Sequence, residues 1–154
     1  MSVDVTSYKM INSLKQTLSQ LENVTYLKVH SDEEIKAFEE ENGLKLNPIY
    51  TNLLREIGSF KVEDDYSIFE IMSLARLKSW SEEVFKTYEN PFPRVLLIAS
   101  STSGEEFGFI QNKQELYVFD PECPCDLWEE EQLKAYTFED WLTLLAESKL
   151  ETLW

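Results

Sequence analysis

The chain has 154 residues, of which 29 are acidic and 14 are basic, so its formal net charge at pH 7 is −15. Apolar residues make up 43% and aromatic residues 13% of the chain, which excludes a disordered acidic protein. The charge argues against binding to nucleic acid or to an anionic membrane, because phosphate contacts require Lys or Arg. We therefore expect any macromolecular partner to be basic.

The sequence predicts a soluble cytoplasmic protein. Its first residues, Met1 to Val5, lack the basic and apolar regions of a secretory signal. The longest aliphatic run, Val95 to Ala99, is far shorter than the roughly 18 residues that a membrane-spanning helix needs.

Two cysteines, Cys123 and Cys125, are separated by one residue, and a disulfide between them would be strained. A zinc site needs about four ligands, whereas the only histidine, His30, is distant in sequence. We expect free thiols, no metal site and no cofactor. A redox or metal role for the two cysteines is the alternative.

The first predicted element is an amphipathic helix from Tyr8 to Leu21. Ile11, Leu14 and Leu18 fall at alternating steps of three and four residues along it, which is the period of one helical face. We expect this stripe to pack on the core of the chain itself, and a partner helix is the alternative.

Two helices with clear end signals follow. Ser31 and Glu34 have the spacing of a capping box, and Gly43 is placed to end the helix in a left-handed conformation. Asn47 is the expected N-cap of the next helix, which starts at Pro48 and ends before Gly58.

The rest of the chain is richer in strand signals. We predict strands at Tyr66–Met72, Val95–Ala99, Phe107–Gln111 and Leu116–Phe119, a polar hinge at Ser100–Gly104, and a hairpin turn at Asn112–Lys113. Helical patterns cover Leu77–Tyr88 and the segment that opens at Thr137, with Phe138, Trp141, Leu142 and Leu145 buried. This order predicts an α+β fold: one domain over residues 1–154, with an antiparallel-rich mixed sheet, flanked by N-terminal helices and one C-terminal helix.

No set of residues for catalysis can be assembled from the sequence. His30 directly precedes a helix cap, where we expect an exposed imidazole without a task. The serines at 100–103 lack the context of a nucleophile elbow, and acid pairs such as Glu105–Glu106 are expected in so acidic a chain. We therefore expect that the protein is not an enzyme.

The negative charge is concentrated in the last third of the chain. Residues 95–154 hold 13 acidic and three basic residues, a net charge of −10, and no base interrupts the stretch between Lys113 and Lys134. This stretch is either a solvated loop or a docking surface for a basic protein. The residues expected to form the docking surface are Glu115, Asp120, Glu122, Asp126, Trp128, Glu129, Glu130 and Glu131.

The helix pair resembles the N-terminal signature of the SUKH superfamily, which includes fungal cell-wall-synthesis regulators and bacterial immunity proteins. The matching positions are Ile35, Phe38, Glu39, Gly43, Leu46, Tyr50, Leu53, Leu54, Ile57 and Gly58. The strands 95–99, 107–109 and 116–120 and the helix start Thr137–Leu142 are also similar. Two positions depart from the family pattern: Asn47 separates Leu46 from Pro48, and Ser59 replaces a second glycine.

The resemblance implies a non-catalytic protein that neutralises a cognate toxin. Several toxins of such systems are nucleases, and a basic nuclease would fit an acidic surface. The alternative is a regulatory scaffold like the fungal relatives. We expect a monomer or a weak homodimer, in which Trp154 or the helix Ile11–Leu21 would form the contact.

Overall fold

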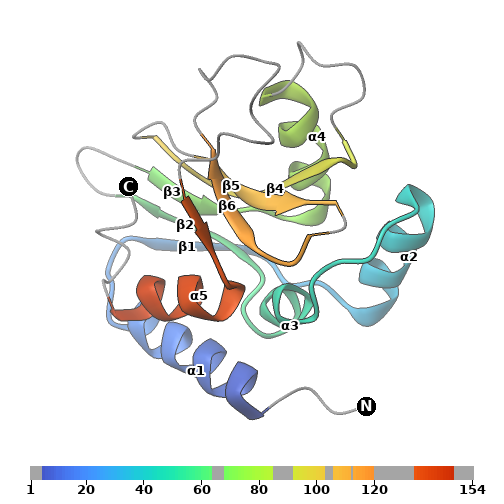
Figure 1. Cartoon of the computed structure of the whole chain (residues 1–154). Helices are drawn as coiled ribbons and strands as arrows, with labels where there is room; N and C mark the ends of the chain where they lie inside the picture. The colour runs from blue at the N-terminus through green and yellow to red at the C-terminus, as the bar shows by residue number, and fades with distance from the viewer. Residues whose placement is uncertain are drawn as a thin grey trace.

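A seven-stranded sheet lies at the centre of the described part of the chain (Figure 1). The computed structural model describes residues 5–63, 68–84, 92–102, 106–111, 113–119 and 134–147. Strand order follows chain order, and all six neighbouring pairs are antiparallel. The strands are β1 (Val24–Lys28), β2 (Ser59–Glu63), β3 (Ile68–Ile71), β4 (Val95–Ser101), β5 (Glu106–Ile110), β6 (Leu116–Phe119) and β7 (Lys134–Tyr136).

Five helices surround this sheet within the same residue ranges. They are α1 (Val5–Ser19), α2 (Asp32–Asn42), α3 (Pro48–Glu56), α4 (Leu74–Val84) and α5 (Phe138–Glu147). The predicted α+β class is confirmed. Among the described strands the sheet is antiparallel throughout, so no parallel pair of the expected mixed type occurs there.

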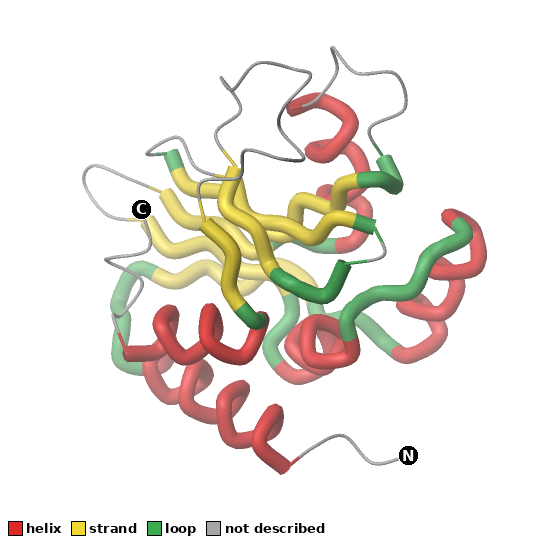
Figure 2. The backbone as a smooth tube through the Cα atoms, in the orientation of Figure 1, coloured by secondary structure: helices red, strands yellow, loops and turns green. Residues whose placement is uncertain are grey.

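The helices cover both faces of the sheet, with α1 and α5 on one side and α4 on the other (Figure 2). The side chains of β4 show that the sheet separates two hydrophobic clusters, because successive side chains of a strand point to opposite faces. Leu96 and Ile98 join the larger core with α1, α3 and α5, whereas Val95 and Leu97 form a smaller cluster. Trp80 of α4 packs against that smaller cluster.

Aromatic rings fill the larger core between the sheet and α5. The Trp141 ring lies 5.5 Å from Phe107 and 5.7 Å from Phe138, measured between centroids. Phe138 in turn lies 5.4 Å from Phe109. The burial predicted for Phe138, Trp141, Leu142 and Leu145 is confirmed, since none of the four is more than 1% exposed.

The apolar stripe of α1 packs against the chain itself, as expected. Ile11 and Leu14 are fully buried and Leu18 is 1% exposed, and α1 lies beside α5. These three side chains therefore cannot supply a dimer contact. Trp154, the other residue considered for such a contact, lies outside the described residues.

The predicted helix ends are confirmed in atomic detail. Ser31 Oγ accepts from the Glu34 N–H at 3.2 Å, and a Glu34 carboxylate oxygen accepts from the Ser31 N–H at 3.3 Å. Gly43 ends α2 with a φ of 63°, and Asn47 Oδ1 accepts from the N–H of Ile49.

Several boundaries differ from the sequence prediction. The strands β1, β2 and β7 were not predicted, and α4 begins at Leu74 rather than Leu77. The expected hinge is also wrong at its start, because Ser100 and Ser101 continue β4 and pair with β3. Each of β1 and β2 is only five residues long and contains a lysine, so their sequences give a weak strand signal and only their pairing with neighbouring strands reveals them.

Gly58 permits the close crossing between the end of α3 and β1. Its φ is 84°, and a Cβ atom there would lie 2.1 Å from the carbonyl oxygen of Lys28. Only glycine fits both requirements. The start of β2 is thereby held directly against the backbone of β1.

Candidate partner-binding site

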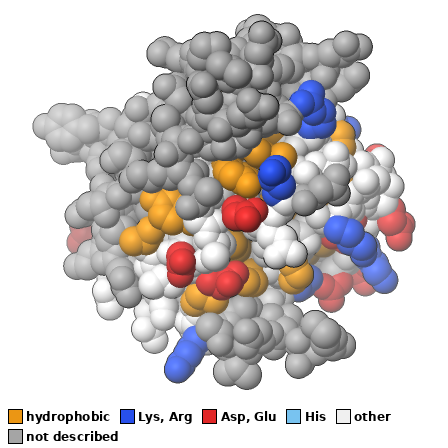
Figure 3. All heavy atoms as spheres, viewed as in Figure 1, with side chains coloured by type: hydrophobic (Ala, Val, Ile, Leu, Met, Phe, Trp, Pro, Cys, Tyr) orange, Lys and Arg blue, Asp and Glu red, His pale blue; other side chains and the backbone are white. Residues whose placement is uncertain are grey.

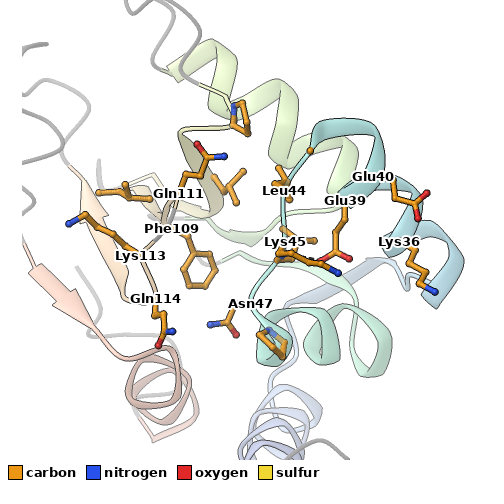
Figure 4. A pocket seen from close by; sticks show the side chains of 16 residues that line it. Lys36, Glu39, Glu40, Leu44, Lys45, Asn47, Phe109, Gln111, Lys113 and Gln114 are labelled. Atoms are coloured by element: carbon orange, nitrogen blue, oxygen red, sulfur yellow. Dashed lines mark hydrogen bonds between the residues drawn. The ribbon is translucent and has the colours of Figure 1, made fainter. Parts of the chain in front are cut away.

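A cleft of about 840 Å³ opens between the α2–α3 connection and the turn that joins β5 to β6 (Figure 4). Four apolar residues that are each only 5% exposed form its base: Leu46, Leu96, Phe109 and Ile110. The walls carry polar and charged side chains from residues 36–48 and 111–114. A volume of this size is typical of sites that hold a small ligand or a short segment of a partner.

The first wall, residues 43–48, is held in place by local hydrogen bonds to Glu39 and to the Asn47 side chain. The Leu44 N–H donates to the Glu39 carbonyl at 3.0 Å, and the Leu46 N–H donates to Glu39 Oε2 at 2.8 Å. The Asn47 cap then fixes the start of α3. This connection therefore has a defined shape even though much of it faces solvent.

The second wall is the end of the β4–β5 pair and the turn after it. The Gln111 N–H donates to the Arg94 carbonyl at 2.8 Å, and the Lys113 N–H donates to the Ile110 carbonyl at 3.0 Å. Phe109 lies between the two walls, and its ring packs 6.2 Å from that of Tyr50. Because Tyr50 is fully buried, the base of the cleft is anchored in the main core.

The charge of the cleft differs from that of the whole chain. Three exposed lysines, Lys36, Lys45 and Lys113, line it together with Glu39 and Glu40. Its lining therefore carries a formal charge of about +1 in a chain whose net charge is −15. Figure 3 shows acidic and basic side chains side by side among apolar ones on the described part of this face.

Of the residues predicted to form an acidic docking surface, the structure describes Glu115. Glu115 is exposed, and its Oε2 accepts from the Tyr117 hydroxyl at 3.3 Å. It follows directly after Gln114, which lines the cleft, so the acidic stretch begins at the rim of the cleft. The other predicted residues, Asp120, Glu122, Asp126, Trp128, Glu129, Glu130 and Glu131, lie outside the described residues, as do both cysteines.

The expectation of an exposed, unoccupied imidazole at His30 is wrong. The His30 side chain is buried, and its Nε2 accepts from the N–H of Leu74, the first residue of α4. Its Nδ1 lies 3.4 Å from Glu34 Oε2 in a geometry that makes no hydrogen bond. Burial therefore outweighs the nearby carboxylate and lowers the pKa of His30 below its ordinary value of 6.5.

Glu106, one of a pair of adjacent acids for which we expected no special role, is also buried. It is 4% exposed and accepts a hydrogen bond from the indole N–H of Trp80. Burial raises the pKa of Glu106 to about 7. Through this hydrogen bond to Trp80, the carboxyl group connects α4 to the sheet.

The described ranges contain no group of three His, Cys, Asp or Glu side chains placed to hold a metal ion. Within the same ranges, none of the helices has both the length and the apolar character needed to cross a membrane. The cleft itself could not be predicted from the sequence, because its walls come from segments that are more than forty residues apart. Only the wall at 43–48 carried a local signal, the paired helix caps.

A known protein family matches the part of the chain that builds this cleft. Over 150 residues the chain is 29% identical to a protein named immunity protein RhsIB from Dickeya dadantii (strain 3937), covering 93% of this chain and 86% of that protein. The model of the SMI1 / KNR4 family (SUKH-1) matches residues 30–144, which include both walls of the cleft and the helices α2 to α5 through Leu144. This chain therefore belongs to the SMI1 / KNR4 family (SUKH-1).

Proposed function

We propose that this chain, as a single domain in the cytoplasm, is an immunity protein that neutralises a cognate toxin by binding it, without catalysis. The observation that carries this proposal is the likeness to immunity protein RhsIB along nearly the full length of both proteins. The match extends over 150 residues at 29% identity, which favours a shared function over a shared fold alone. It also favours immunity over a regulatory scaffold, which the family match by itself would equally allow.

We further propose that the toxin is basic, for example a nuclease, and that it docks on the acidic surface from Glu115 to Glu131. Opposite charge speeds the encounter of two proteins and orients them. The rim of the cleft, where this stretch begins, would then receive a segment of the same toxin.

The direct experiment needs a candidate toxin, which a toxin gene neighbouring that of this chain would supply. Its expression alone should stop growth, and co-expression of this chain should restore growth. A toxin domain that this chain neither binds nor neutralises would overturn the proposal.

Charge reversal tests the acidic surface. Changing Glu129, Glu130 and Glu131 together to Lys should slow association with the toxin at low salt, with a smaller effect at high salt. The matched control reverses Glu22, Glu33 and Glu41, which are exposed and lie outside both the acidic stretch and the cleft. Equal association rates for both triple variants would remove residues 129–131 from the proposed surface.

A second pair of substitutions tests the cleft. Changing Lys45 and Lys113 to Glu makes its rim acidic. If the segment in the cleft is basic, association should become faster, and if that segment carries acidic side chains, binding should weaken. An unchanged rate and affinity would show that the toxin does not contact the cleft.

A further inference from the structure

The strand β1 forms one edge of the described sheet (Figure 1). Apolar side chains at this edge are exposed. Within the described residues it pairs only with β2. Tyr26 is 56% exposed, Leu27 is 49% exposed, and Val29 directly after the strand is 58% exposed. Natural edge strands usually carry charged side chains that prevent pairing with another chain, and this edge carries mainly apolar ones.

The charge around β1 is unlike that of the rest of the chain. No acidic residue occurs between Glu22 and Asp32, although acids make up 29 of the 154 residues. The only formally charged side chain of β1 is Lys28, and its Nζ lies 3.1 Å from Glu34 Oε2 of the same chain. The lysine charge is thus already compensated, and the edge as a whole is nearly neutral.

These observations favour a second copy of this chain as the partner of β1. Two copies with a charge of −15 each repel one another, and β1 is a place where they can approach, because the strand has no acidic residue and the nearby Glu34 carboxylate is paired with Lys28. A basic toxin would gain nothing from an edge that lacks acids. An edge strand also offers backbone N–H and C=O groups that an identical antiparallel strand can satisfy.

We propose that two copies of the protein associate through antiparallel pairing of their β1 strands about a two-fold axis at Tyr26. Such an axis places Lys28 opposite Val24 of the second copy and Thr25 opposite Leu27, so no two charged residues of the paired β1 strands face each other. The two Tyr26 side chains meet at the axis, where directly opposed residues contact most closely. The sheets of the two copies then form one continuous sheet.

The pairing is short, and the register of β1 shifts between Tyr26 and Lys28. An interface limited to one strand from each copy falls in the small class of weak interfaces, below roughly 1,200 Å². The dimer should therefore form only at high protein concentration. Added salt should strengthen it, because salt screens the repulsion between the two acidic copies.

Sedimentation equilibrium of the purified chain, from micromolar to near-millimolar concentration, tests the proposal. The unmodified chain should show a monomer–dimer equilibrium that shifts towards the dimer as salt is raised. Tyr26→Glu should raise the dimer dissociation constant roughly tenfold or more, because it opposes two carboxylates at the axis. The control Tyr8→Glu changes another exposed tyrosine, which is 43% exposed on α1, and should leave the constant unchanged.

A mixing experiment makes the test specific for the axis. Tyr26→Glu and Tyr26→Lys should each be monomeric alone, and an equal mixture of the two should dimerise, because opposite charges then face each other. Circular dichroism establishes that both variants are folded. A chain that stays monomeric at all concentrations would overturn the proposal, as would a dimer that Tyr26→Glu does not weaken. Neither outcome affects the proposed toxin binding.

Discussion

The two faces of the sheet are covered by helices of different chemistry. On one face, Phe138 and Trp141 of α5 pack on aromatic rings of β3 and β5 within a large hydrophobic cluster. On the other face, α4 meets two buried carboxyl groups, Glu70 and Glu106.

Hydrogen bonds fix α4 on this second face. Arg76 of α4 contacts both carboxylate oxygens of Glu70, at 3.1 and 3.4 Å, and its guanidinium lies 4.8 Å from the centre of the Trp80 ring. The Trp80 indole N–H donates to Glu106 on β5, which β4 separates from β3. Arg76 and Trp80 thus connect α4 to β3 and β5 as one unit.

The difference shows how the same sheet uses two means of attaching a helix. Apolar burial contributes a large free energy and does not depend on pH. Buried polar groups contribute less net free energy, yet each one that loses its partner is costly, so they fix the position of the helix. We therefore expect the α5 face to dominate stability and the α4 face to give stability its pH dependence.

The largest effect is expected on the apolar face. Trp141→Ala removes a fully buried ring and should lower the free energy of unfolding by about 3 to 5 kcal/mol. Trp141→Phe should cost much less, because the Trp141 Nε1 has no acceptor among the described residues and only part of the ring is lost. Urea denaturation followed by circular dichroism measures both, and equal losses for the two variants would contradict this account.

The apolar face was largely predictable from the sequence, and the polar face was not. The spacing of Phe138, Trp141, Leu142 and Leu145 is a local pattern that already defines a buried helical face. Glu70 and Glu106 meet α4 only because β3, β4 and β5 are neighbours in the sheet. The sequence around either residue contains no pattern that predicts this strand order.

The candidate cleft had the same limitation, since its walls come from segments that are distant in the chain. The caps at Gly43 and Asn47 were visible in the sequence, whereas the approach of Phe109 to them was not. The acidic stretch could be recognised in the sequence from its charge. Of its predicted docking residues, the structure places Glu115, and the docking role of the stretch stays a prediction.

A second prediction concerns the buried Glu106. Its pKa of about 7 in the folded state is above the ordinary value of 4.5, so the folded state binds more protons than the unfolded state between these values. Stability from this group is therefore present at low pH and is lost as the pH rises from about 4.5 to about 7, by on the order of 3 kcal/mol. Glu106→Gln keeps an acceptor for Trp80 and should remove this loss, so the variant should exceed the unmodified protein in stability at pH 8.

Glu70→Gln is the matched control for that measurement. It makes the same change on the same face, yet it weakens the ion pair with Arg76 and should lower stability at pH 8 rather than raise it. Urea unfolding of all three proteins at several pH values compares them directly. If Glu106→Gln were destabilising at pH 8, the burial of a charged carboxylate would not be the cost that we infer.

A smaller effect is expected at Ser81, which is fully buried in α4. Its hydroxyl donates to the Leu77 carbonyl at 2.7 Å and accepts from the Leu97 N–H of β4 at 2.9 Å. Ser81→Ala leaves that buried N–H without its acceptor and should cost about 1 to 2 kcal/mol. The exposed Ser79→Ala, on the same helix, is the control and should be nearly neutral. Thermal unfolding of both variants distinguishes them.

The smallest expected effect, at His30, has the opposite pH dependence to Glu106. Burial lowers the pKa of His30 in the folded state, so the unfolded state binds the proton more readily and stability falls as the pH decreases through 6.5. Protonation would also set an N–H of the imidazole against the N–H of Leu74, which His30 Nε2 now accepts. His30→Gln should therefore cost about 1 kcal/mol at pH 7.5. This cost should shrink towards pH 5, where the unmodified protein pays for the charge. A cost that stayed constant across this range would mean that His30 is not buried as a neutral acceptor, and the start of α4 would need another anchor.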